Sequence, residues 1–526
     1  MGDFPHYDVI VIGSGAGGGT LAHRVAPSGK RVLILERGDY LPRERDNWDS
    51  TAVFVKGKYR APEFWLDRHG NEFPPEVNYY VGGNTKFYGA ALFRLRPEDF
   101  GDLRHHDGVS PAWPIRYEDL EPYYTQAEHL YRVHGRHGED PWEGRCSAQY
   151  AHPPVEHEPR IQQLSDDLEK QGLHPFHLPI GVDLTQGDGG RPTHTSACIR
   201  CNRVDGFPCL VRAKSDAQVI CVEPALLQPN VEMITNARVT RLETDPTGRN
   251  VTAAVVRFEG EEEARFSADV VVVACGAVNS AALLLASASE AHPNGLANSS
   301  DVVGRHYMRH NNLALMAVSK EPNETQFQKT LALHDWYLGA DDWEYPLGGI
   351  QMLGKSDAEQ IHGEAPRWAG AVAPDMPFEV LAHHAVDFWL CGEDLPQPGN
   401  RITLDGDGRI RLTLDEHNNT AGLARLRHKL QQMLGRLGMH EHQLLSHSIY
   451  LHKGMPIGAT AHQAGTVRFG THPASSALDV DCKAHDVDNL YVVDTSFFPS
   501  IGAVNPSLTA IANALRVGDH LVERLS

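Results

Sequence analysis

A glycine-rich turn near the N-terminus is the first part of the chain that could do chemistry. It reads Gly13-Ser14-Gly15-Ala16-Gly17-Gly18 and lies between an apolar run over 7–12, which predicts a buried strand, and a predicted helix over 20–25. A second predicted strand over 31–35 ends at Glu36. Glycines at this spacing let the backbone approach a pyrophosphate at a helix N-terminus, and the acidic side chain can accept hydrogen bonds from both hydroxyls of an adenosine ribose. The sequence therefore predicts a dinucleotide site at Gly13, Gly15, Gly18 and Glu36, where Glu36 would repel a 2′-phosphate.

Three cysteines and a histidine form a second group of potential ligands. Their spacing is His194-x3-Cys198-x2-Cys201-x7-Cys209. Such residues could bind zinc, and three thiolates could hold a small iron–sulfur cluster. The same pattern is also compatible with packed thiols. We adopt this last interpretation and predict no metal ligand.

Composition limits the classes of protein to consider. The chain has 526 residues, enough for two or three domains or one large two-lobed unit, and 41% of them are hydrophobic. Its net charge of −20 opposes nucleic acid and anionic membranes as partners. Eight unevenly spaced cysteines are too few for a disulfide framework, and the N-terminus lacks a signal-peptide pattern. We therefore expect a cytoplasmic protein.

The elements that must position these residues follow two different patterns. Up to about residue 310 the chain alternates strands and helices, and the uncharged run Val270–Ser289 reads as strand, tight turn and helix rather than a membrane span. Residues 311–454 instead carry strand signals and then an amphipathic helix over 421–437. This second pattern predicts an antiparallel sheet flanked by helices, with strands over 383–389, 401–404 and 410–414.

Segments at the C-terminus carry a resemblance to a known family. Ala461–Gly470, Asn489–Ser496 and Val504–Thr509, together with the glycine turn, resemble the glucose-methanol-choline (GMC) oxidoreductase family of flavoproteins. The likeness covers both ends and much of the middle of the chain. Within the family, the chain looks most similar to bacterial sugar and polyol dehydrogenases and glycoside (pyranose) oxidases. Supporting blocks lie at 81–84, 113–124, 276–288 and 295–305.

The resemblance implies an α/β fold in which a Rossmann-like FAD-binding domain accompanies a discontinuous, antiparallel-sheet substrate-binding domain. On this basis we expect residues 1–55, 205–310 and 455–526 to form the FAD-binding domain. Residues 56–204 would be connecting and cap segments with the cysteine cluster, and 311–454 the substrate-binding domain.

The resemblance also implies which residues hold FAD. Gly13, Gly15, Gly18 and Glu36 would bind its adenosine end, and the backbone of Val239 would contact the adenine. Gly83 and Asn84 would lie near the isoalloxazine, and Asp494 near the pyrophosphate and ribityl chain. Some members bond a histidine covalently to the flavin, but Phe87 stands at that position, so we expect noncovalent FAD.

The family's general base maps onto His462, and its partner maps onto Asn505. A neutral imidazole suits removal of a hydroxyl proton at pH 7. Asn505 could hold the substrate oxygen, and it could also cap a helix with Pro506 at its first position. A helix beginning at Pro506 would aim its positive end at the flavin. His452 and His472 are rival bases, with His472 expected beyond the pocket.

These inferences predict an FAD-dependent enzyme that oxidises an alcohol, expected to be a sugar or glycoside hydroxyl, by hydride transfer to flavin N5. One alternative is an oxidoreductase of small aliphatic, aromatic or amino alcohols. Another is a lyase or a noncatalytic flavoprotein, against which the presence of both His462 and Asn505 counts. Oxygen or another acceptor, such as a dye, quinone or cytochrome, would reoxidise the flavin.

Overall fold

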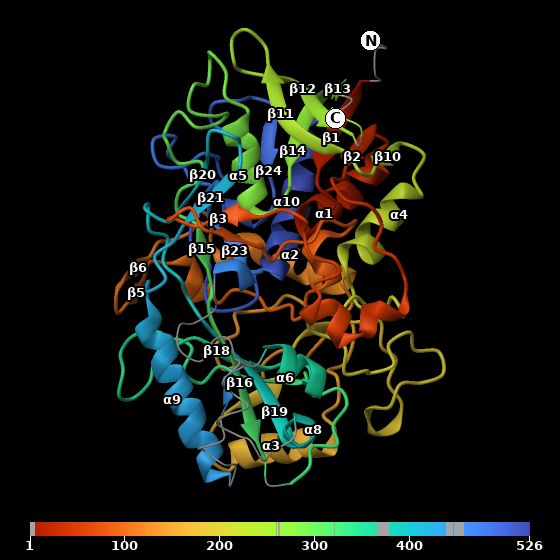
Figure 1. Ribbon diagram of the computed structural model, residues 1–526, viewed down its shortest axis with the longest axis vertical. Helices are drawn as coiled ribbons and strands as arrows, with labels where there is room; N and C mark the ends of the chain where they lie inside the picture. The colour runs from red at the N-terminus through yellow and green to blue at the C-terminus, as the bar shows by residue number, and fades with distance from the viewer. Residues whose placement is uncertain are drawn as a thin grey trace.

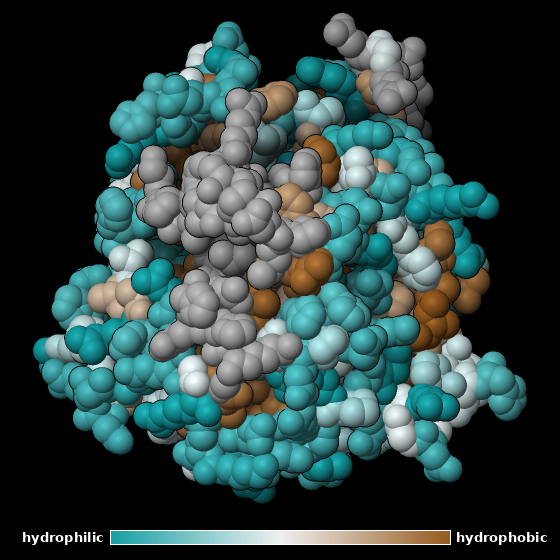
Figure 2. Space-filling model, turned by 60° about the horizontal axis from the view of Figure 1, so that its bottom comes forward, coloured by the Kyte–Doolittle hydropathy of each residue, from teal (hydrophilic) through white to brown (hydrophobic). Residues whose placement is uncertain are grey.

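The computed structural model describes residues 6–258, 260, 263–319, 321–364, 378–437, 445–446 and 457–526. Figure 1 shows two lobes, each built around a sheet, with both chain termini on the upper lobe. The face in Figure 2 is mainly hydrophilic, as expected for a chain with a net charge of −20.

The upper lobe contains a five-stranded parallel sheet. Its strands occur in the order β10 (Val231–Ile234), β2 (Val32–Leu35), β1 (Tyr7–Ile12), β14 (Ala268–Val273) and β24 (Leu490–Val492). β1 and β2 are almost uninterrupted runs of aliphatic residues because both faces of a parallel sheet are covered by protein. The sequence prediction of a strand–helix–strand unit at the N-terminus is confirmed.

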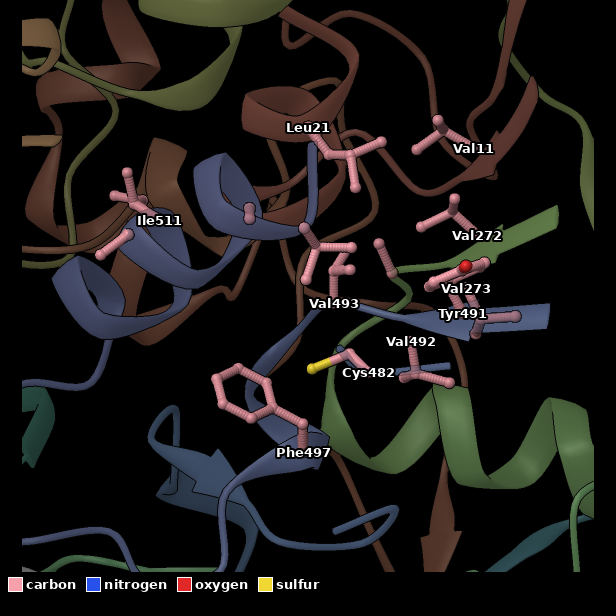
Figure 3. Close-up of a cluster of buried hydrophobic side chains, with 14 of the residues drawn as sticks. Val11, Leu21, Val272, Val273, Cys482, Tyr491, Val492, Val493, Phe497 and Ile511 are labelled. Atoms are coloured by element: carbon pink, nitrogen blue, oxygen red, sulfur yellow. The ribbon is translucent and has the colours of Figure 1, made fainter. Parts of the chain in front are cut away.

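Helices cover this sheet on both sides. α1 (Ala16–Val25) packs against α10 (Ser507–Arg524), which in turn packs against α2 (Tyr117–Leu130). Figure 3 shows side chains from the strands, including Val11 and Val272, in the same buried cluster as Leu21 of α1 and Ile511 of α10. On the other side lies α5 (Ala277–Ala286), so the uncharged run of the sequence is indeed strand, turn and helix. In the part of the chain that the structure describes, no helix combines the length and apolarity needed to cross a bilayer.

A three-stranded antiparallel sheet lies at the top of this lobe in Figure 1. It comprises β11 (Arg238–Thr244), β12 (Val251–Arg257) and β13 (Glu263–Phe266). Because β11 follows soon after β10, it brings Val239 close to the end of β2. This placement connects the small sheet to the dinucleotide end of the predicted site.

The lower lobe contains a six-stranded sheet in which every pair is antiparallel. The predicted fold class is therefore confirmed. One strand, β8, comes from the expected connecting segments and joins the edge of the sheet. The strand order is β22 (Leu445–Ser446), β16 (Asn311–Val318), β19 (Ala385–Gly392), β18 (Gly349–Met352), β17 (Leu331–Leu333) and β8 (Pro175–His177).

The two faces of this sheet differ in chemistry. One face packs leucines, isoleucines and Phe388 against α3 (Pro159–Glu169) and α9 (Thr420–Arg436). Successive side chains of a strand alternate between faces, and directly paired residues share a face. Gln351 pairs with Trp389, and Asn312 pairs with Cys391 two residues further along β19. Asn312, Gln351 and Trp389 therefore lie together on the face away from α9.

Two element boundaries differ from the sequence prediction. The strand expected from 383 begins at Ala385, because α8 (Phe378–His384) occupies the preceding residues. Backbone N–H groups of Ser319 and Asn323 donate to the carbonyls of His384 and His383, which satisfies the end of that helix. The helix expected over 421–437 is α9, one residue displaced.

Short elements complete the chain. β20 (Arg401–Leu404), β21 (Ile410–Thr413), β3 (Trp65–Leu66) and β4 (Glu72–Phe73) form a four-stranded sheet, which confirms the strands predicted at 401–404 and 410–414. The other helices and strands of the described residues are α4 (Glu223–Leu226), α6 (Ala358–Glu364), β5 (Leu103–His105), β6 (Gly108–Ser110), β7 (Val133–His134), β9 (Ile180–Gly181), β15 (Met308–Arg309) and β23 (Gln463–Ala464).

Candidate active site

A cavity of about 1440 Å³ runs from the glycine turn at the end of β1 to the polar face of the six-stranded sheet. It exceeds the ~300–1,000 Å³ of most small-molecule pockets, so it has room for a dinucleotide and a second molecule. Gly18 is the only one of the predicted site residues that does not line it. Those that do are Gly13, Gly15, Glu36, Gly83, Asn84, Val239, His462, Asp494, Asn505 and Pro506.

Each glycine of the turn is needed for a different structural reason. Gly13 has φ +99°, a conformation that L side chains rarely adopt. A Cβ on Gly18 would overlap the carbonyl oxygen of Gly13, so Gly18 allows α1 to approach the strand. A Cβ on Gly15 would meet no atom within 4 Å, because this residue faces the open cavity. Gly15 therefore borders the space for a ligand, whereas Gly18 serves packing.

Glu36 lies at the end of β2 with 6% of its surface exposed. Its Oε2 accepts hydrogen bonds from Ser14 N–H at 3.0 Å and from the Ser14 hydroxyl at 2.6 Å, and its Oε1 accepts one from Gly38 N–H at 2.8 Å. Burial raises the pKa of its carboxyl, against these hydrogen bonds. Oε1 retains a free acceptor position toward the cavity.

The carboxylate of Asp494, which follows β24, lies beside the N-terminus of α5. The Asp494 carboxylate accepts hydrogen bonds from Gly276 N–H at 3.0 Å, from Ser496 N–H at 2.9 Å and from the Ser280 hydroxyl. Burial raises the pKa of this carboxyl above its usual value. Gly276 has open space where a Cβ would be. Two helix N-termini, of α1 and α5, thus reach the same part of the cavity, where a pyrophosphate would be favoured.

The second glycine turn forms a one-turn helix over Gly83–Lys86 that borders the cavity. The Asn84 amide oxygen accepts from Asn78 N–H at 2.9 Å, which fixes its orientation. Phe87 follows, lines the cavity and packs its ring near those of Tyr59 and Tyr80. A phenyl ring carries no nucleophile that could bond to a cofactor.

A cluster at the adenosine end was not predicted. The Arg37 guanidinium lies 3.8 Å from the ring centre of Tyr79, and both side chains bond to the Glu63 carboxylate. Arg37 lowers the pKa of Glu63 against the effect of its burial. Arg37 directly follows Glu36, which could have suggested its position, but nothing in the sequence connects it with residues 63 and 79.

His462 lines the opposite end of the cavity. Its Nδ1 lies 2.8 Å from Nδ1 of His310, a residue that sequence reasoning missed. Burial, together with the positive charge of Lys329, lowers the pKa of His462 to about 4. The imidazole is therefore neutral at pH 7. Of the rival bases, His472 is exposed and away from the cavity, and His452 lies outside the described residues.

Asn505 lies on the same cavity wall, just before α10. The Gln351 amide N–H donates to Asn505 Oδ1 at 2.8 Å. The prediction that Asn505 caps the helix is wrong: α10 begins at Ser507, Pro506 is at its N-cap, and no side chain caps it. The Asn505 amide is instead committed to the contact with Gln351.

The adjoining face of the six-stranded sheet contributes polar and aromatic groups. Trp389, Asn312 and Gln351 line the cavity, and the amide oxygens of Asn312 and Gln351 are buried without a hydrogen-bond partner. The side chains of Lys329 and Asp205 form an ion pair at the cavity wall. A buried acceptor without a partner is costly, so this wall favours a ligand that offers donors such as hydroxyl or ammonium groups.

The cysteine cluster lies away from the groups that line the cavity. Cys198 is buried and Cys201 and Cys209 are partly buried, and all three thiols are free. Burial raises the pKa of Cys198 to about 12, which favours the thiol over the thiolate. Among the described residues, three potential ligands converge within 4.8 Å only at His137, Glu143 and Cys146. His194 and the three predicted cysteines do not converge in this way.

The residues that line the cavity fit FAD. An open backbone at Gly15, an acidic residue at the end of β2 and two converging helix N-termini suit an adenosine and a pyrophosphate. The remaining volume reaches His462 and Asn505.

Comparisons with known proteins agree with this fit. Family models described as GMC oxidoreductase match residues 78–312 and 396–514, and one described as FAD binding domain matches residues 8–42. The chain is 32% identical to 6'''-hydroxyparomomycin C oxidase of Streptomyces lividus, over 99% of this chain and 92% of that protein. It is 31% identical to paromamine 6'-oxidase of Streptomyces fradiae, over 97% and 90%.

Solved structures show the same fold. The structure of pyridoxine 4-oxidase from Mesorbium loti superposes with a TM-score of 0.65 at 18% identity, covering 98% of this chain and 99% of that one. A formate oxidase of Aspergillus oryzae superposes with the same score at 16% identity, over 100% and 99%. With two family models that together span more than half of its length, and relatives above 30% identity along nearly all of it, the chain belongs to the GMC oxidoreductase family.

Proposed function

We propose that this flavoenzyme oxidises a hydroxyl group of a sugar or glycoside, with His462 as the general base. The observation that carries the proposal is a neutral imidazole and an oriented amide that line one cavity together with an indole and two unpartnered amide oxygens.

The chain's own residues handle the proton and the substrate oxygen. His462, neutral because of its burial, accepts the hydroxyl proton at its cavity-facing nitrogen. Gln351 occupies Asn505 Oδ1, which leaves the Asn505 N–H group to donate to the oxygen as negative charge develops there. FAD, when bound, would supply the acceptor for the hydride of the carbinol carbon.

A carbohydrate fits the part of the cavity that the six-stranded sheet lines. The indole of Trp389 offers a surface for stacking, and the free oxygens of Asn312 and Gln351 accept from hydroxyl or ammonium groups. The names of the two Streptomyces relatives add amino sugars to the class of candidates. Small aliphatic, aromatic or amino alcohols are the second candidate class, because 2-methyl-1,2-propanediol dehydrogenase of Mycolicibacterium austroafricanum is 28% identical over 99% of this chain.

The test is a substrate panel under anaerobic conditions, with flavin absorbance as the readout. Neutral glycosides, aminoglycosides and small diols are mixed separately with the yellow enzyme. We expect sugars or aminoglycosides to bleach the flavin at lower concentrations than diols do. If only diols bleach the flavin, a carbohydrate substrate is rejected. If no alcohol bleaches it, the proposed oxidation of an alcohol is rejected. Repeating the reaction of the enzyme with the substrate that bleaches it, once with oxygen and once with a dye, identifies the electron acceptor.

We propose that FAD is held noncovalently, because Phe87 offers no atom for a bond to the flavin. Acid precipitation should release the yellow colour into the supernatant. A pellet that stays yellow would contradict this proposal.

Domain boundaries and location belong to the same proposal. Residues 1–55, 205–310 and 455–526 supply all five strands of the parallel sheet, which supports one FAD-binding domain from three segments. Residues 311–454 would form the substrate-binding domain, to which residues 56–204 add β8. Eight free thiols favour the reducing cytoplasm.

A further inference from the structure

We propose that His310 is a positioning residue that fixes the tautomer of His462, so that the cavity-facing nitrogen of His462 is the one without a proton. This inference rests on the proposed function, in which His462 must accept a proton. It adds a residue that does not line the cavity and that no sequence pattern indicated.

The contact between the two histidines is close and enclosed. His310 lies between β15 and β16 and has 1% of its surface exposed. Its Nδ1 is 2.8 Å from Nδ1 of His462, and the rings are nearly perpendicular at 87° with centres 4.9 Å apart. A nitrogen–nitrogen distance of 2.8 Å requires a proton between the two atoms, because two lone pairs would repel each other.

Both rings are neutral, so one nitrogen donates and the other accepts. Burial lowers the pKa of His310 well below its ordinary value, and the pKa of His462 is also lowered. If His462 Nδ1 donates, its Nε2 carries a lone pair and can act as a base. If His310 Nδ1 donates instead, His462 Nε2 carries the proton and the base is blocked. The direction of this hydrogen bond therefore decides whether the reaction can proceed.

The far side of His310 sets the direction. Its Nε2 is fully buried and makes no hydrogen bond of ordinary geometry. The backbone of Ile501 and Gly502 raises the pKa of His310 against the effect of its burial, as carbonyl groups near a ring N–H do. Because Nδ1 of His310 contacts His462, we assign these carbonyl groups to the Nε2 side, where they would repel a lone pair. The proton of the neutral ring is thus placed on Nε2, which leaves His310 Nδ1 as the acceptor.

The backbone beside His310 is itself held in place. Ile501 N–H and Gly502 N–H donate to Glu393 Oε1 at 3.3 and 3.0 Å. The same carboxylate accepts from the Ser110 hydroxyl at 2.7 Å and contacts His105 Nε2 at 2.9 Å. The Gly502 N–H shares its peptide plane with the Ile501 carbonyl, so Glu393 fixes the orientation of that carbonyl. The Gly502 carbonyl is fixed in the same way, because the Ala503 N–H donates to the Tyr337 hydroxyl at 3.0 Å.

Two substitutions of His310 distinguish a role as hydrogen-bond acceptor from a role in packing. His310→Asn keeps a carbonyl oxygen near the position of Nδ1, whereas His310→Leu fills the space without an acceptor. We expect His310→Leu to slow anaerobic flavin reduction by about 10- to 10²-fold, the usual cost of removing the partner that orients a functional histidine, without weakening substrate binding. His310→Asn should stay within a few-fold of the wild type. Equal loss in both variants, with intact FAD content and thermal stability, would overturn the proposal.

The base itself provides the next control. In a His462→Ala background no tautomer remains to be set, so adding His310→Leu should cause no further slowing. Slowing by the same factor as in the wild type would show that His310 acts elsewhere.

Neutron diffraction gives a readout that does not depend on activity. We expect hydrogen on Nδ1 of His462 and on Nε2 of His310. Hydrogen on Nε2 of His462 would overturn the proposal directly. If no alcohol reduces the flavin of the wild-type enzyme, the proposed function fails. The positions of these hydrogens would still test the role of His310.

Discussion

Burial gives His462, the base that we propose, the neutral form that proton transfer requires. With a pKa of about 4 it is ready to accept a proton across the whole neutral range. His462→Ala should retain FAD, because the ring faces the substrate end of the cavity, and should slow flavin reduction by about 10²- to 10⁴-fold. His472→Ala is the matched control, since His472 is exposed and outside the cavity, and it should reduce at the wild-type rate. Stopped-flow absorbance under anaerobic conditions measures both.

The pH dependence of the same step follows from the sign of the shift. The active form of His462 is neutral, so the rate constant for flavin reduction should fall only as the pH drops toward about 4. In His462→Ala, flavin reduction should not show this decrease at low pH. An acid limb centred near 6.5, the ordinary histidine value, would contradict the burial of the ring in the working enzyme.

At the level of residues, the sequence predicted the groups that belong to local motifs. Gly13, Gly15, Glu36 and Asp494 line the cavity as expected. The hydrogen-bond partners of the two proposed catalytic residues could not be predicted, because His310 and His462 are 152 positions apart and Gln351 and Asn505 are 154 apart. Only the folded chain brings these pairs together.

At the level of elements, the first helix depends on two glycines with opposite roles. Alanine normally stabilises a helix relative to glycine by about 1 kcal/mol. Gly18→Ala should instead destabilise the protein by about 1–3 kcal/mol, because the new Cβ overlaps the Gly13 carbonyl oxygen. Gly15→Ala should leave the stability of the FAD-free protein unchanged but weaken FAD binding, since its Cβ would project into the cavity.

Urea unfolding of the FAD-free variants and titration with FAD separate the two effects. The reverse pattern, with Gly15→Ala unstable and Gly18→Ala normal, would mean that the turn packs differently.

Elements with strong periodicity could be predicted, and those fixed by tertiary contacts could not. β1, β2, β14, α5 and α9 stand where hydrophobic spacing indicated them. β8 could not be predicted, because a three-residue strand has too little pattern of its own and forms by pairing with β17.

At the level of the whole molecule, buried histidines make stability depend on pH. Below pH 6.5 the unfolded chain protonates histidines that the folded protein keeps neutral, so stability should fall as the pH drops from about 6.5 toward about 4. Among the residues that the structure describes, four carboxyls with raised pKa values oppose this trend: Glu36, Asp99, Asp394 and Asp494. In the same part of the chain, eight histidines with lowered pKa values outnumber them: His23, His134, His152, His157, His306, His310, His334 and His462.

The melting temperature between about pH 7 and about pH 5 measures this balance. His157, whose pKa burial lowers to about 3, offers a matched test. His157→Asn should make the decline shallower, and the exposed His472→Asn should not change it. A melting temperature that rises on acidification would show that the carboxyls dominate.

The order of strands in the parallel sheet has a consequence for synthesis of the protein. β24, which pairs with β14, is made more than 450 residues after β1 and β2, together with the nearby His462, Asp494 and Asn505. Pairing across so long a sequence separation is intrinsically slow. Until it occurs, β14 is an apolar sheet edge without its neighbour, which favours aggregation. The nascent chain therefore completes its cofactor site only once this distant strand has been made, and the yield of folded protein should depend on chaperones and on the supply of FAD at that stage.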